Sequence, residues 1–181
     1  MSPQTHGDPR ACPVPVGEYA EQAVDYVDRA LGIALEFDSD TLPVLDHYLR
    51  SVPGDEPALL ALVSVTSGAY FGEVVRRHLG GQWDLSSGDP ATWRVVLPTG
   101  LSFAPAGVVA EAIAQNEVGG LESAFDAPPR LRPHLETALE RMGDVTVETY
   151  YSLCGRLDTL EHLQDVLLAV AASLASRERD S

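Results

Sequence analysis

The segment from Ala58 to Trp83 constrains the fold of this chain more than any other, with the sequence ALLALVSVTSGAYFGEVVRRHLGGQW. Residues Ala58–Val63 are apolar without interruption, so a helix here has no polar face and must be buried on most sides. The helical pattern stops at Gly80 and Gly81, because glycine readily adopts the left-handed conformation that follows a last turn. We therefore predict a central buried helix at about 57–79.

Small residues recur along this predicted helix at intervals of four, at Ser64, Gly68 and Gly72. Such a stripe lets another backbone approach closely, and the same spacing promotes helix pairing in membranes. The charges of Glu73 and Arg76, however, end the apolar run before the roughly 20 residues that a membrane span needs. No window has the pattern of a signal peptide, so we expect a cytoplasmic protein without a membrane partner.

The net charge of −15 is the strongest compositional signal, and residues 17–57 contribute ten acidic residues against two arginines. An acidic surface repels nucleic-acid phosphates and anionic lipids, so we expect no nucleic-acid partner. It attracts a basic protein, although acidity that serves only solubility remains the alternative. All 12 basic residues are arginines, which excludes lysine chemistry such as a Schiff base or a Walker-type phosphate grip.

The remaining periodicities predict an α+β fold, a helical domain around a small antiparallel β-meander. Residues 1–16 are proline-rich and are expected to be a disordered leader, followed by a single domain over 17–181. Further helices are expected at 17–35, from Ser39 or Asp40 to about 49, at 106–115 and at 131–142, and strands at 82–85, 92–97 and 101–103.

Two predictions concern the C-terminal part of the chain. Residues 145–151 alternate like a strand, but Thr146 is a good helix cap, and we favour a helix there. Asp158 and Glu161 have the spacing of a capping box, which predicts that the last helix begins there. Its leucine seam packs on the core or pairs with a partner helix, which leaves a homodimer open; the seam comprises Leu160, Leu163, Leu167, Val170 and Leu174.

Glu73 is the strongest candidate for a catalytic group. A carboxylate at the end of a buried helix is a candidate general base if burial raises its pKa. The alternative is a structural ion pair, because Arg76 and Arg77 follow at the three- and four-residue spacings of a helix. Tyr70, one turn earlier, is placed to hydrogen-bond to Glu73 in either case.

Nothing in the sequence indicates a metal or a cofactor. The histidines follow no metal-binding spacing, and Cys12 and Cys154 lie far apart in no CxxC pattern, which is typical of free thiols. Asp38 and Asp40 have the spacing of a calcium loop, but Pro43 occupies the position that needs glycine. The motifs of serine hydrolases, phosphate-binding loops and dinucleotide-binding folds are missing from the sequence.

Two segments carry a resemblance to other proteins: FDSDTLPVLDHYL at Phe37–Leu49 and GAYFGEVVRRHLGGQW at Gly68–Trp83. The second contains the pattern GAYxGEVxRxxxGGxW. Together, over roughly residues 20–105, they resemble a group of uncharacterised bacterial proteins that includes DUF3806-like members. The resemblance implies an architecture of helices followed by a short β segment, and it implies no activity.

We therefore expect a non-enzymatic protein-binding module, one concrete form being an immunity or antitoxin-like protein that covers a cationic toxin. Fast, salt-sensitive association is typical of such acidic surfaces. The expected partner-binding residues are Glu18, Glu21, Asp25, Asp28, Asp38 and Asp40. Two alternatives remain: a small enzyme acting on an anionic substrate through Tyr70, Glu73, Arg76 and Arg77, and a self-assembling structural component.

Overall fold

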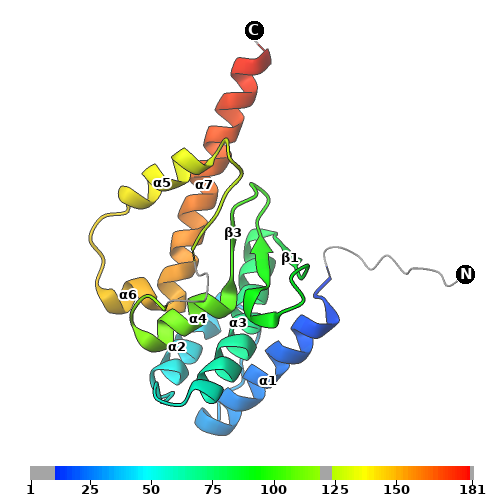
Figure 1. Cartoon of the computed structure of the whole chain (residues 1–181), viewed down its shortest axis with the longest axis vertical. Helices are drawn as coiled ribbons and strands as arrows, with labels where there is room; N and C mark the ends of the chain where they lie inside the picture. The colour runs from blue at the N-terminus through cyan, green and yellow to red at the C-terminus, as the bar shows by residue number, and fades with distance from the viewer. Residues whose placement is uncertain (1–10, 119–123, 180–181) are drawn as a thin grey trace, which may run out of the picture.

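A long helix, α3, lies at the centre of the fold, with α1 and α4 packed along it (Figure 1). The computed structural model describes residues 11–118 and 124–179. Helix α3 spans Pro57–Leu79, as the sequence predicts, and Gly80 follows it in the left-handed conformation with φ of 79°. By length and composition α3 would suffice to cross a membrane, yet here it is mostly buried as a core helix.

The small residues of α3 explain how closely its neighbours approach. A Cβ at Gly68 would lie 2.7 Å from the Cα of Ala106 at the start of α4, and a Cβ at Gly72 would overlap the ring of Trp83. Helix α4 spans Pro105–Ala114, with proline in its first turn. The glycines therefore set the distance between α3 and the elements that follow it.

The predicted β-meander is present as a three-stranded antiparallel sheet. Strands β1 (Gln82–Asp84), β2 (Arg94–Val96) and β3 (Ser102–Phe103) follow one another in chain order, with a short 3-10 helix η2 (Pro90–Thr92) between the first two. Trp83 pairs with Val95 and Val95 with Phe103 across the sheet. The fold class predicted from the sequence is confirmed.

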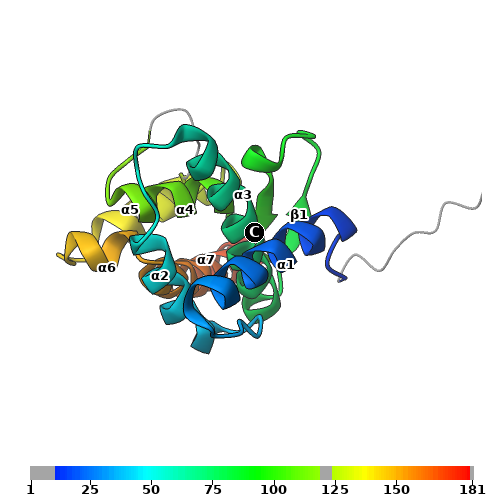
Figure 2. The same cartoon turned by 90° about the horizontal axis from the view of Figure 1, so that it is seen from below.

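Helix α1 packs along α3, and α2 packs against α4 and the C-terminal helix α7. Helix α1 spans Val14–Leu31 and buries the face that carries Val16, Ala20, Ala23 and Val27. The 3-10 helix η1 (Ser39–Thr41) leads into α2 (Leu42–Arg50), whose buried leucines face the same core. Figure 2 shows α1, α2, α3 and α4 grouped around this core when the molecule is viewed from below.

The predicted bounds of α1 are wrong at both ends. The helix begins at Val14, so the last residues of the expected leader are ordered, while residues 1–10 lie outside the described residues. Pro13 precedes the helix and Pro15 lies in its first turn, where a missing N–H costs nothing. The helix ends at Leu31 because Gly32 adopts the left-handed conformation, with φ of 66°.

The C-terminal part consists of α5 (Arg132–Glu140), α6 (Val147–Tyr151) and the long α7 (Leu153–Arg179). Residues 147–151 are helical and Thr146 caps them, as favoured from the sequence. The end of α7 projects beyond the body of the molecule in Figure 1. The seam leucines Leu160, Leu163 and Leu167 are fully buried in the chain's own core, whereas Val170 and Leu174 are half-buried.

The prediction that α7 begins at a capping box is wrong. The helix starts five residues earlier than Asp158, and the Asp46 side chain of α2 accepts hydrogen bonds from the N–H groups of Leu153 (2.7 Å) and Cys154 (3.2 Å). Ser152 Oγ accepts a third, from the N–H of Gly155 at 2.9 Å. The Glu161 carboxylate contacts His78 Nε2 of α3 instead of taking part in a cap.

Candidate functional site

The structure brings Glu73, Arg76 and Arg77 together at the C-terminal end of α3, as the helical spacing predicts. The Glu73 carboxylate is fully buried and accepts hydrogen bonds from three side chains. Arg76 donates twice, through Nε to Oε2 and through Nη2 to Oε1, each at 2.8 Å. Arg77 Nε donates to Oε1 at 2.8 Å, and Trp83 Nε1 donates to Oε2 at 3.1 Å.

These bonds decide the protonation state of Glu73. Burial alone would raise its pKa, but the hydrogen bonds from Arg76, Arg77 and Trp83 outweigh burial and lower the pKa to about 2. Glu73 therefore lacks the raised pKa that a general base needs, which favours the alternative of a structural ion pair with Arg76 and Arg77. A carboxylate this acidic, with four hydrogen bonds on its two oxygens, has little tendency to accept a proton near neutral pH.

Tyr70 does not take the place beside Glu73 that the sequence suggested. Its buried hydroxyl lies 2.6 Å from Thr41 Oγ1 and accepts a hydrogen bond from the N–H of Phe37 at 3.0 Å. Phe37 has a positive φ of 58°, a conformation that this bond helps to hold. Tyr70 therefore fixes the segment between α1 and α2, while Arg77 stacks over the Phe37 ring at 4.8 Å.

Cys12 lies beside the Glu73 cluster, which the sequence did not indicate. Burial, followed by the charge of Glu73 and a hydrogen bond to it, raises the pKa of the Cys12 thiol to about 11. Cys154 is in a comparable position next to Asp46, where burial and that carboxylate raise its pKa to about 12. Both thiols are therefore protonated near neutral pH, which is the opposite of a nucleophilic cysteine.

A second buried ion pair, between Glu111 of α4 and Arg156 of α7, carries no local sequence signal. Arg156 Nη2 donates to Glu111 Oε2 at 2.9 Å, and both side chains are almost fully buried. The guanidinium also lies 4.1 Å from the centre of the Tyr150 ring. The partners are 45 residues apart, so the pair joins α4, α6 and α7 in a way that helical spacing cannot reveal.

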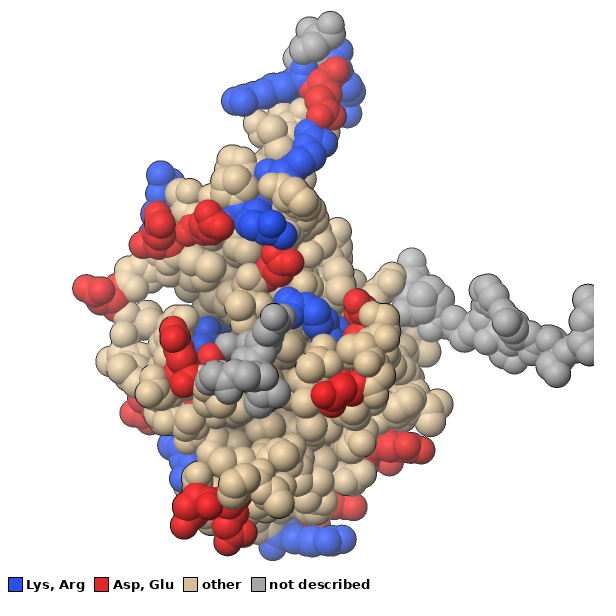
Figure 3. All heavy atoms as spheres, viewed as in Figure 1, with Lys and Arg blue, Asp and Glu red and all other residues tan. Residues whose placement is uncertain are grey.

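All six acidic residues expected to bind a partner are exposed. Glu18, Glu21, Asp25 and Asp28 follow α1 at intervals of three and four residues, on the face opposite its buried residues. Asp38 and Asp40 lie at η1, where Asp38 also accepts a hydrogen bond from the N–H of Thr41. In Figure 3, acidic side chains follow the lower right edge of the molecule, where Figure 1 places α1.

Within residues 11–118 and 124–179, no group of three or more histidine, cysteine, aspartate or glutamate side chains is placed to hold a metal ion. Comparisons with models of known protein families, with curated proteins and with solved structures found no match for this chain. The resemblance noted from the motif at Gly68–Trp83 therefore stays an expectation about the family, while the motif has a structural explanation. Its glycines, glutamate, arginine and tryptophan are the residues that pack the end of α3.

Proposed function

We propose that this protein is a non-enzymatic, cytoplasmic binding module whose acidic α1 face meets a basic protein partner. An immunity or antitoxin-like role, in which the module covers a cationic toxin, is one concrete form. The observation that supports it most is the exposure of Glu18, Glu21, Asp25 and Asp28 along one face of α1. Such a face steers a cationic partner during encounter and raises the association rate.

The Glu73 cluster supports this choice indirectly. An enzyme acting on an anionic substrate would need hydrogen-bond donors that point into an accessible site. Arg76 instead donates through Nε and Nη2 to the buried carboxylate of Glu73. Arg77 is half exposed, but its Nε is bonded to Glu73 and its guanidinium stacks on Phe37. This arrangement favours a role in stability over a role in catalysis.

The proposal is tested by capturing partners with the full chain from a lysate of the organism that encodes it, and by measuring the purified partner's association rate. Between 50 and 500 mM salt we expect the rate to fall by about tenfold or more, because exposed charges are screened over a Debye length. A rate that does not change with salt would overturn the proposal.

A neutralised variant shows whether the α1 face is responsible. The triple variant Glu21→Gln, Asp25→Asn and Asp28→Asn is expected to reduce the association rate and flatten its salt dependence. The matched control neutralises three exposed acidic residues around α5, Glu136→Gln, Glu140→Gln and Asp144→Asn. Equal effects of the two triple variants would assign the attraction to net charge and remove the α1 face as the site.

A further inference from the structure

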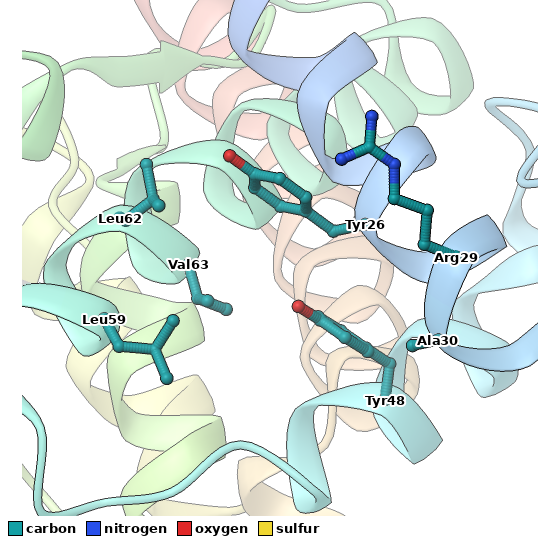
Figure 4. A pocket seen from close by; sticks show the side chains of 7 residues that line it. All are labelled: Tyr26, Arg29, Ala30, Tyr48, Leu59, Leu62 and Val63. Atoms are coloured by element: carbon teal, nitrogen blue, oxygen red, sulfur yellow. The ribbon is translucent and has the colours of Figure 1, made fainter.

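An apolar groove with a volume of about 350 Å³ opens between α1, α2 and α3 (Figure 4). Helix α3 contributes Leu59, Leu62 and Val63 to its wall, and Tyr26 and Tyr48 face them from α1 and α2. Leu62 keeps 42% of its surface exposed, which is high for a leucine. This volume is at the lower end of the range of ligand pockets and suits one large side chain.

Two phenol hydroxyls point into this apolar space. Figure 4 shows the hydroxyl ends of Tyr26 and Tyr48 directed toward the side of the groove formed by α3. Within the described parts of the chain, neither hydroxyl has a protein hydrogen-bond partner. A tyrosine phenol is neutral near pH 7, and its oxygen can accept a hydrogen bond.

Two exposed carboxylates, which do not line the groove, lie close in sequence to residues that do. Asp25 lies four residues before Arg29, which is at the rim, and Glu56 immediately precedes α3, one turn before Leu59. Both acidic residues are exposed. Figure 4 shows Arg29 on the α1 side of the groove, across from Leu59 and Val63, which form an uncharged floor. The groove thus combines an apolar floor with a single charged lining residue, Arg29, and it adjoins the α1 face that carries Asp25.

We propose that this groove receives a tryptophan side chain of the basic partner, with flanking arginine or lysine residues of the partner meeting Asp25 and Glu56. This inference rests on the proposed function and names the partner's chemistry. An indole fills an apolar groove of this size, packs on the two tyrosine rings and donates its N–H to a phenol oxygen. Tryptophan and arginine are also the residues that most often dominate the affinity of protein interfaces.

The test uses two synthetic peptides, acetyl-Arg-Arg-Trp-Arg-Arg-amide and the same peptide with alanine in place of tryptophan. Each is titrated into the full chain at low salt, and chemical shifts of backbone and methyl groups report where it binds. We expect the tryptophan peptide to bind about tenfold more tightly, with its largest shifts at Leu62 and Val63. Free indole binding as tightly as the tryptophan peptide would assign the groove to a small molecule and overturn the inference.

Variants of the full chain show whether the difference in affinity between the two peptides arises at the groove. Leu62→Asp is expected to bring the ratio of the two affinities close to one, whereas Leu168→Asp adds the same charge at an equally exposed leucine of α7 and should leave the ratio unchanged. Tyr48→Phe keeps the ring and should lower the ratio by a few fold, through the lost hydroxyl, even if Leu62→Asp proves too unstable to measure.

The two proposals fail in different ways. Equal affinity of both peptides, with shifts confined to α1, would overturn the tryptophan groove and leave the acidic face in place. Binding of neither peptide at low salt would remove the electrostatic basis of the proposed function, and this inference with it.

Discussion

Glu73 and Asp46 are both buried carboxylates, but different parts of the chain satisfy them. Glu73 is bonded to side chains of its own helix and to Trp83, ten residues away. Asp46 is bonded to backbone N–H groups at the start of α7, more than 100 residues away. Each has a cysteine beside it, and neither cysteine is ionised near neutral pH. One acid thus stabilises the end of a helix locally, and the other joins two distant parts of the fold.

Because they are bonded differently, the two carboxylates are expected to contribute different amounts to the free energy of unfolding. Removal of Glu73 takes from the largely buried Arg76 the carboxylate that accepts two of its hydrogen bonds, and breaking a buried ion pair is very costly. Removal of Asp46 leaves two neutral N–H groups without an acceptor at a helix start, which costs less. Replacing Glu73 is therefore expected to destabilise the fold more than replacing Asp46.

Glu73→Ala should have the largest effect. We expect a loss of about 4 kcal/mol in the free energy of unfolding, because Arg76 would remain buried without its carboxylate. Denaturant unfolding at neutral pH measures this loss, with Glu21→Ala on the exposed face of α1 as the control. A loss below about 1 kcal/mol would mean that Arg76 reaches solvent freely and that the cluster contributes little.

Acid should remove the contribution of Glu73 in a defined pH range. Its pKa is lowered from 4.5 to about 2, so its contribution is complete above pH 4.5 and is lost as the pH falls toward 2. The shift corresponds to roughly 3 kcal/mol in the free energy of unfolding. The stability difference between the wild type and Glu73→Gln should therefore shrink over this range, and a difference that stays constant would contradict the lowered pKa.

Asp46→Ala should have an intermediate effect of about 2 kcal/mol, the cost of losing a charged helix cap. Asp46→Asn keeps one oxygen as an acceptor and should lose about half as much. Hydrogen exchange supplies the more specific measurement, because the N–H groups of Leu153 and Cys154 should lose protection first. If those two amides kept their protection in Asp46→Ala, Asp46 would not be the cap.

The sequence predicts the centre of the fold well because its signals there are local. The apolar run and Gly80 define α3, and the spacing of Glu73, Arg76 and Arg77 predicts their contact. The contact with Trp83 depends on the turn that returns β1 to α3, so helical spacing does not predict it. Of the two alternatives for Glu73, the lowered pKa favours the structural ion pair with Arg76 and Arg77 over the general base.

The start of α7 has one local cap and one distant cap. Ser152, directly before the helix, accepts from the N–H of Gly155 and could have been predicted, whereas Asp46 sits in the middle of another helix and has no capping pattern of its own. Asp158 and Glu161 do have such a pattern, but they lie inside α7. The pattern at Asp158 and Glu161 and the contact with Asp46 therefore place the start of α7 at different residues. The three-dimensional structure shows the start at Leu153, beside Asp46.

Asp158→Ala should have the smallest effect and separates these two explanations most directly. A true helix cap loses about 1 kcal/mol when it is replaced by alanine. Asp158 is exposed within α7, so we expect a change within about 0.5 kcal/mol, measured by denaturant unfolding. Ser152→Ala is the matched comparison, because Ser152 Oγ accepts the hydrogen bond from Gly155 and should lose about 1 kcal/mol. If Asp158→Ala were the more harmful of the two, the helix would begin where the sequence motif places it, and Asp46 would lose its role in joining α2 to α7.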